Sequence, residues 1–421
     1  MDDRESVGLA VHARCCANWS FVKVDGPMKA GACVARGAPF RFELLKQSQR
    51  SGARAGILHT PHGTIETPAY VPVGTNGALK FVDHGQSFDA GTRLMFSNTY
   101  HLLVHPGADV IERCGGIHAW SGRNAPFITD SGGFQVFSLA SGTVRGELKS
   151  RNTKREGSII QSTEEGVVFS SYRDGTRIEL TPESTIVAQK AIGADIIIPL
   201  DELPPQGAGM DQNALRRSVE KSMRWEERSL VEHLKNTNSQ AMFAVVHGGL
   251  DQRLREYSAD YLARLPFDGF AIGGSLGRSV EDASQVLQYV MPKLPPAKPV
   301  HLLGLADHGM LLMGIQKGVD TFDSCFPTKA ARHGTAFLAS HGHNGTTYSR
   351  LYLRSGKHKD DMRPIDEACT CLCCRNYSRA FVHHLLKQNE AVGLTLVSVH
   401  NIHHTHDIVK QMRQGILDGR V

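Results

Sequence analysis

The chain has 421 residues, of which 41% are hydrophobic, and a formal net charge of +5. This length and apolar content allow one large domain with appendages around a substantial core. The sequence does not show the pattern of a signal peptide, in which a basic region, an apolar region and a small-residue cleavage site follow one another. It also has no run of about 20 apolar residues, so we expect a soluble, cytoplasmic protein and not a membrane-spanning one.

Residues 1–40 have no sustained periodicity, and we expect them to be an extension outside the fold. From residue 41 to 421 we expect one domain, in which short apolar, β-branched runs alternate with helical stretches. Eight runs are candidate strands: 69–74, 93–100, 126–130, 194–202, 241–249, 269–274, 300–305 and 319–324.

Helical spacing and start signals lie between many of these runs. Thr181 and Pro182 open one helical segment at 181–193, and residues 211–234 form another. Two extended runs around "RDGT" within 166–180 indicate an inserted β-hairpin. Buried strands that alternate with helices about eight times, without a dinucleotide glycine fingerprint, predict an α/β fold: an irregular (β/α)8 barrel.

Polar residues stand where the predicted strands end. Asp130, Asp201, His247 and Asp323 each follow an apolar run, as does the pair Gly273 and Gly274. (β/α)8 enzymes build their sites at these carboxyl ends. One such aspartate alone can cap a helix, and paired glycines can form a tight turn. Three carboxylates at one mouth indicate an enzyme, because packed like charges cost energy unless a ligand or reaction needs them.

Carboxylates in a cleft suit chemistry at the anomeric carbon of a sugar. One carboxylate attacks to form a covalent glycosyl intermediate, and another handles the proton of the departing group. Glycines would let a flat ring approach the backbone closely.

Four cysteines crowd the segment "CTCLCC" at 369–374. Cys369, Cys371 and Cys374, with His400 further along, would make a closed tetrahedral Cys3His site for one structural zinc ion. Cys373 is the surplus thiol, because only one residue separates it from Cys371. A redox or unliganded cluster is the alternative.

Two other histidines, His383 and His384, compete with His400 for the fourth position. We favour His400 because it follows "LTLVSV", which we interpret as an extended run that could return beside the cysteines. The zinc-binding subdomain would span about 360–405.

Basic residues gather at 145–155 and at 329–363, where they could meet a nucleic acid or simply form solvated loops.

Long motifs make the chain resemble the tRNA-guanine transglycosylases (queuine tRNA-ribosyltransferases) of the bacterial type, most like the chlamydial members. They are "NTYHLLVHPG", "ITDSGGFQVFSL", "FDSCFPTKAARHG" and "CTCLCCRNYSRAFVHHL". The resemblance implies a zinc-bearing (β/α)8 barrel. It also implies an enzyme that replaces the wobble guanine of GUN-anticodon tRNAs with a 7-deazaguanine base, as a step in queuosine formation. The resemblance further implies that this enzyme is a homodimer.

The resemblance assigns roles to individual residues. Asp323 matches the nucleophile that attacks ribose C1′, Asp130 the acid/base residue, and Asp201 the carboxylate that pairs with the guanine edge. It implies that the base pocket is also lined by Ser131, Gly132, Gly133, Phe134, His247, Gly273 and Gly274. The implied tRNA contacts are Gly304, Leu305, Ala306, Asp307, His308, Gly309, Met310, Thr328, Lys329, Ala330, Ala331 and Arg332. The implied zinc ligands are Cys369, Cys371, Cys374 and His400.

The sequence departs from the family pattern at two places. The family usually has glutamine where His247 stands, and glutamate after the paired glycines, where this chain reads "GGSLGRS" with Arg278. A cationic side chain would repel the aminomethyl cation of the bacterial precursor base. We therefore expect queuine to be preferred.

Two other functions use the same features. A retaining glycoside hydrolase would need the same carboxylates, but usually has more aromatic residues in its cleft than a 7% content provides. A non-catalytic, zinc-containing RNA-binding protein would have no use for the strand-end aspartates.

Overall fold

The computed structural model describes residues 40–140, 159–171, 173–203, 211–342 and 345–421. The expected extension up to residue 39 and the basic stretch 145–155 lie outside these residues. Among the helices described, none has the length and apolar content that crossing a bilayer requires.

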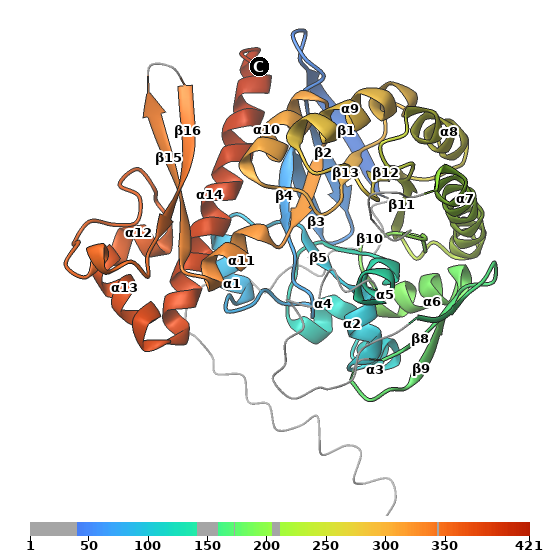
Figure 1. Cartoon of the computed structure of the whole chain (residues 1–421), viewed down its shortest axis with the longest axis horizontal. Coiled ribbons are helices and arrows are strands. Elements are labelled where there is room, and N and C mark those ends of the chain that lie inside the picture. Colours follow the sequence, from blue (N-terminus) through green and yellow to red (C-terminus); the bar gives the residue numbers. More distant parts are fainter. Residues whose placement is uncertain (1–39, 141–158, 172, 204–210, 343–344) are drawn as a thin grey trace, which may run out of the picture. The chain divides into compact units, whose positions relative to one another are not determined.

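Eight parallel strands form the barrel that the sequence predicts (Figure 1). Each predicted run contains one of them: β4 (Ala69–Pro72), β5 (Met95–Ser97), β6 (Phe127–Thr129), β10 (Ile196–Ile197), β11 (Ala241–Val246), β12 (Gly269–Ile272), β13 (Val300–Leu302) and β14 (Thr321–Ser324). Their order is β4-β14-β13-β12-β11-β10-β6-β5. A single bridge between Val73 and Phe96 joins the two ends, so the barrel is nearly closed.

Helices follow most of these strands. Those outside the barrel are α1 (His84–Asp89), α2 (Thr99–Val104), α3 (Ala108–Arg113), α4 (Gly116–Ser121), α5 (Gly133–Ala140), α6 (Pro182–Ile192), α7 (Gln212–Leu234), α8 (Gln252–Leu262), α9 (Val280–Val290), α10 (His308–Gln316) and α11 (Phe326–Arg332), with a 3-10 turn at Met291–Lys293. Thr181 caps α6 in a capping box, as its sequence predicts.

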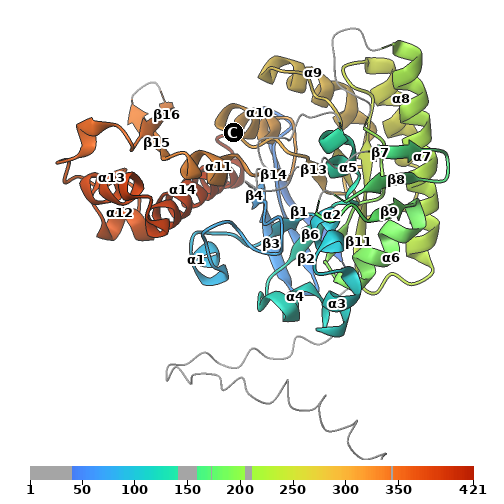
Figure 2. The same cartoon turned by 60° about the horizontal axis from the view of Figure 1, so that its bottom comes forward.

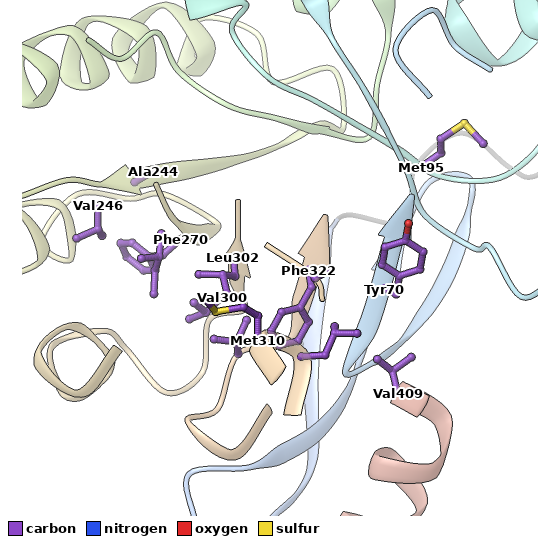
Figure 3. Close-up of a cluster of buried hydrophobic side chains, with 14 of the residues drawn as sticks. Tyr70, Met95, Ala244, Val246, Phe270, Val300, Leu302, Met310, Phe322 and Val409 are labelled. Atoms are coloured by element: carbon purple, nitrogen blue, oxygen red, sulfur yellow. The ribbon is translucent and has the colours of Figure 1, made fainter. Parts of the chain in front are cut away.

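Alternation along the strands divides the core into two layers. Phe243 and Val245 of β11 belong to the cluster inside the barrel, while Met242, Ala244 and Val246 face the helices. Figure 3 shows part of this outer layer, where Phe270, Leu302 and Phe322 from neighbouring strands lie with Met310 of α10. The barrel is therefore packed on both faces of its sheet, which explains why its strands are apolar throughout.

A small antiparallel sheet packs on the barrel interior. It consists of β1 (Arg41–Gln47), β2 (Arg54–Thr60) and β3 (Gly63–Thr67). Leu58 and Ile65 join the interior cluster. The buried Arg54 guanidinium pairs with Asp320, which directly precedes β14. The sheet thus lies at the amino-terminal end of the barrel strands, opposite the predicted site.

The predicted hairpin is present as β8 (Val167–Ser170) and β9 (Arg177–Leu180), and β7 (Ile159–Ser162) adds a third strand. Figure 2 shows this sheet beside α6 and α7. Phe169 and Leu180 pack in one cluster with Trp225 of α7, and the Trp225 indole donates to the Glu164 carbonyl at 2.7 Å.

The last part of the described chain forms a separate lobe of the same unit. It contains the hairpin β15 (Thr335–Gly342) and β16 (Gly345–Tyr352), a 3-10 turn at Gly356–His358, and the helices α12 (Leu372–Asn376), α13 (Arg379–Gln388) and α14 (Ala391–Asp418). Helix α14 runs from this lobe along α11 and β4 of the barrel (Figure 1). The Asn401 side chain donates to the carbonyls of Pro327 and Thr335 at 3.0 and 2.9 Å, so α14 ties α11 to β15.

Candidate active site and metal centre

The three predicted aspartates stand at one mouth of the barrel. Asp130 follows β6, Asp201 follows the short β10, and Asp323 is the last residue but one of β14. All three are buried. Because the strands are parallel, their carboxyl ends meet at the same mouth.

Asp323 is held through one of its two oxygens. Oδ1 accepts the Gly304 backbone N–H at 2.8 Å and lies 3.1 Å from Nε2 of His301. Gly304 has φ +77°, a conformation that glycine adopts without strain. The buried Tyr70 hydroxyl donates to the Ser324 carbonyl at 2.8 Å and fixes the end of β14. The carboxylate of Asp323 is therefore rigidly placed.

Asp130 accepts three hydrogen bonds. The side chains of Asn98 and Gln135 and the backbone N–H of Thr99 all donate to it at 2.9 Å. Burial raises the pKa of Asp130 to about 6, while these donors lower it and the Asp201 charge raises it further. The carboxyl group can therefore gain or lose a proton near neutral pH, as acid/base catalysis requires.

Asp201 lies beside His247 at the next strand end. Nε2 of His247 is 3.0 Å from Oδ2 of Asp201, but the angles are not those of a hydrogen bond. Among the described residues, this buried nitrogen has no hydrogen-bond partner. A ligand at the mouth can therefore satisfy it.

The paired glycines are required by protein neighbours. A Cβ at Gly273 would lie 2.7 Å from Cγ1 of Val245, and one at Gly274, where φ is +72°, would lie 3.0 Å from Nδ1 of His247. Gly133 similarly approaches the Asp201 carbonyl, which its Cβ would meet at 2.9 Å. Close packing accounts for these glycines before any ligand is considered. Beside them, the ring of Phe134 is half exposed at the start of α5, whereas Ser131 and Gly132 are buried.

Sequence reasoning missed several groups that shape this mouth. Asn98 and Gln135 lie inside motifs quoted for the family resemblance, but their contact with Asp130 needs the fold to be visible. Arg255 of α8 is fully buried and donates to the carbonyls of Val246, Gly249, Gly273 and Ser275, so it holds together the loops after β11 and β12. Its burial has no sequence signal that we can identify.

The two stretches predicted to contact tRNA follow adjacent strands. Gly304–Met310 forms the loop after β13 and the first turn of α10, and Thr328–Arg332 lies in α11 after β14. Lys329 is exposed. The imidazole of His308 packs against Phe337, Tyr348 and His404. Burial lowers the pKa of His308 to about 4, so its ring is neutral at pH 7 and adds no positive charge.

The cysteine cluster gathers as its spacing predicts. The Sγ atoms of Cys369, Cys371 and Cys374 lie 3.6, 3.6 and 3.3 Å from Nδ1 of His400. The four ligand atoms all lie within 4.8 Å of one another. Nε2 of His400 is 2.8 Å from the Phe337 carbonyl. Because that contact needs the proton on Nε2, Nδ1 presents a lone pair to the three sulfurs, which suits a bound metal ion.

Cys373 is buried on α12 outside this group, so its identification as the surplus thiol agrees with the geometry. One reason given for His400 is wrong. Residues 394–399 are not extended but belong to α14, and His400 reaches the cysteines from that helix. The competing His383 directs Nδ1 to the Leu353 carbonyl at 2.7 Å.

Comparison with known proteins agrees with these features. The family profile described as "Queuine tRNA-ribosyltransferase" matches residues 48–421. The chain belongs to this family. Proteins named queuine tRNA-ribosyltransferase include one from Protochlamydia amoebophila that is 47% identical over 378 residues, covering 90% of this chain and 95% of that protein. Another, from Chlamydia trachomatis, is 46% identical over 384 residues, covering 90% and 99%. Family membership and the likeness to chlamydial members are thus confirmed.

Proposed function

We propose that this protein exchanges the wobble guanine of tRNAs with GUN anticodons for a 7-deazaguanine base, as part of queuosine formation. The observation that carries the proposal is the position of Asp323. It is a buried carboxylate at the mouth of a (β/α)8 barrel, with one oxygen held by donors, facing a mouth that also contains Asp130 and Asp201. Membership of the queuine tRNA-ribosyltransferase family supports this chemistry.

In the first half of the exchange, a carboxylate oxygen of Asp323 forms a bond to ribose C1′. The bond from C1′ to the guanine nitrogen breaks, and its electron pair leaves with the base, which takes up a proton. In the second half, the incoming base loses a proton and its nitrogen attacks C1′, so the carboxylate is released. Asp130 is the group to give and take these protons, because its pKa of about 6 allows both forms near neutral pH.

The purine would be held at the mouth between Asp130 and Asp201. A carboxylate at Asp201 can accept two N–H donors from the guanine edge. The Nε2 atom of His247, which has no hydrogen-bond partner among the described residues, can form a hydrogen bond with a polar group of the purine. Phe134 offers a half-exposed ring on which the base can stack.

The tRNA would lie along 304–310 and 328–332, where Lys329 and Arg332 suit phosphate contacts. The Cys3His cluster would hold one structural zinc ion, since three thiolates and one imidazole leave no open position for water. This ion would stabilise the lobe that anchors α14 beside α11. We further propose that queuine is the preferred incoming base.

The test is exchange of labelled guanine into a GUN-anticodon tRNA transcript by wild type and by Asp323→Ala. Wild type should incorporate label and give a tRNA adduct on denaturing gels, and Asp323→Ala should do neither. An undiminished adduct in Asp323→Ala would rule out this nucleophile. Sugar release from a glycoside without tRNA would instead favour a hydrolase.

A further inference from the structure

His301 is a buried imidazole that touches the proposed nucleophile. It lies in β13 beside β14, and its side chain is fully buried. Nε2 is 3.1 Å from Oδ1 of Asp323, and Nδ1 is 2.8 Å from the Thr321 hydroxyl. The Phe96 ring stacks against the imidazole at 6.1 Å between centroids. The imidazole is therefore confined on two sides by polar contacts and on a third by an aromatic ring.

These contacts favour one arrangement of protons. When the Thr321 hydroxyl donates to Nδ1, the single proton of a neutral imidazole is on Nε2 and points to Asp323. A fully buried histidine without such contacts would leave polar atoms unsatisfied. Thr321 thus orients the His301 ring toward the carboxylate.

The two oxygens of Asp323 differ as a result. Oδ1 faces two N–H donors, from His301 and Gly304. Within the described part of the chain, no hydrogen bond reaches Oδ2. Oδ2 therefore keeps both its lone pairs and its freedom to approach a ligand at the mouth.

We propose that His301 is a positioning residue that holds Oδ1 of Asp323, so that Oδ2 is the atom that attacks C1′. This inference rests on the proposed function. In the first step Oδ2 forms the bond to C1′, the C1′–guanine bond breaks toward the base, and Oδ1 becomes the carbonyl oxygen of the ester. His301 gives up no proton in either step.

The same contacts assist the return of the carboxylate. As the bond between C1′ and Oδ2 breaks in the second step, negative charge redevelops over both oxygens. The N–H groups of His301 and Gly304 are already placed to stabilise it at Oδ1, at no cost of reorganisation. Loss of the His301 donor should therefore slow release of the enzyme from the adduct.

The test compares wild type, His301→Phe, His301→Gln and Thr321→Val in single-turnover reactions with a GUN-anticodon tRNA transcript. Adduct formation is followed with guanine removed, and adduct breakdown after queuine is added. We expect His301→Phe to slow breakdown by about 10- to 100-fold, less than the roughly 100- to 1,000-fold cost of losing one oxyanion donor, because the Gly304 N–H still donates to Oδ1. His301→Gln, whose amide can donate to Oδ1, should restore much of the rate, and Thr321→Val should lie in between.

Stability and catalysis are separated by measuring Tm and by counting only adduct-competent enzyme. Breakdown in His301→Phe at the wild-type rate would overturn the inference, as would equal rates for the Phe and Gln variants. Absence of any adduct or exchange in wild type would overturn the proposed function itself, which is a different result.

Discussion

Nε2 of His247 and Oδ2 of Asp201 lie 3.0 Å apart at neighbouring strand ends. In the proposed function, these two groups would bind the edge of a purine that guanine, the precursor base and queuine have in common. They therefore cannot distinguish between the incoming bases by that edge. Discrimination must come from a group that meets the substituent on the deazapurine ring, and the loop after Gly274 is the nearest candidate in sequence.

The first prediction concerns that choice of base. Arg278 is exposed in the loop, and its backbone N–H donates to Asp282 at 2.9 Å. A cation there would repel the primary aminomethyl group of the precursor more than the shielded secondary amine of queuine. We expect kcat/KM to be higher for queuine, and Arg278→Glu to shift the ratio toward the precursor by about 1.4- to fivefold, since exposed charge pairs contribute about 0.2–1 kcal/mol. A precursor value equal to that of queuine in wild type would contradict this.

A second prediction uses the donors to Asp130. Gln135→Met removes one of three hydrogen bonds to the carboxylate. Because these bonds favour the ionised form, its pKa should rise from about 6 by about one unit, which corresponds to about 1.4 kcal/mol. The ionised form takes the proton of the incoming base, so the acid limb of the kcat/KM profile should move to higher pH. Gln252→Met, on the exposed surface of α8, should leave the profile in place.

A third prediction concerns the metal. Elemental analysis should find about one zinc ion per chain, and Cys371→Ala should lose both the metal and stability, since metal binding and folding are coupled. Cys373→Ser should retain zinc, although its buried hydroxyl would cost about 1–3 kcal/mol if it found no partner. His400→Ala should also lose the zinc ion. Its matched control is His383→Ala, which should keep the ion because His383 contacts the Leu353 carbonyl instead. Zinc loss in Cys373→Ser but not in Cys374→Ser would mean that the ligand set is wrong.

A fourth prediction concerns stability at the other end of the barrel. Arg54→Met would leave the buried Asp320 carboxylate without its cationic partner, and we expect a loss of about 3–5 kcal/mol in the free energy of unfolding. Arg113→Met, which breaks the exposed ion pair with Asp109, should change the free energy of unfolding little. Denaturant unfolding of both variants would check this.

The ion pair between Arg54 and Asp320 also predicts how the stability of the protein changes with pH. Burial raises the pKa of Asp320 to about 6, and Arg54 lowers it. The folded state therefore binds this proton more tightly than the unfolded chain, whose aspartates titrate near about 3.9, and the Asp320 contribution to stability falls as pH rises from about 4 to about 6. In Arg54→Met the folded pKa is higher still, so the fall should continue above pH 6. A variant that loses no more stability at pH 8 than at pH 5 would contradict the assignment.

Most of the barrel could be predicted from its sequence because each strand is buried on both faces and reads as a short apolar run. Polar residues follow several of these runs, so the position of Asp130, Asp201 and Asp323 at one mouth could be predicted without a structure. "LTLVSV" shows the limit of that reasoning. Its β-branched residues favour a strand locally, but they continue the apolar face of the long helix α14, and packing in that helix outweighs the local preference.

The contacts of the site residues could not be predicted in the same way. Gln135 is near Asp130 in the chain, but its amide could have pointed elsewhere. His301 lies over twenty residues before Asp323, and only the register of β13 with β14 brings their side chains together. Such pairings depend on strand register, and strands that are apolar on both faces lack the alternation of polar and apolar residues that would indicate it.

The pairing of β4 with β14 has a consequence for the order of folding. It joins Ala69 to Thr321, so the ladder between these strands can form only after all the other barrel strands have been synthesised. Closing so long a loop is entropically costly and slow, and until it happens the edges of β4 and the later strands stay open to other partners. Synthesis of this protein should therefore pass through an open, aggregation-prone sheet that is sealed only after β14 emerges.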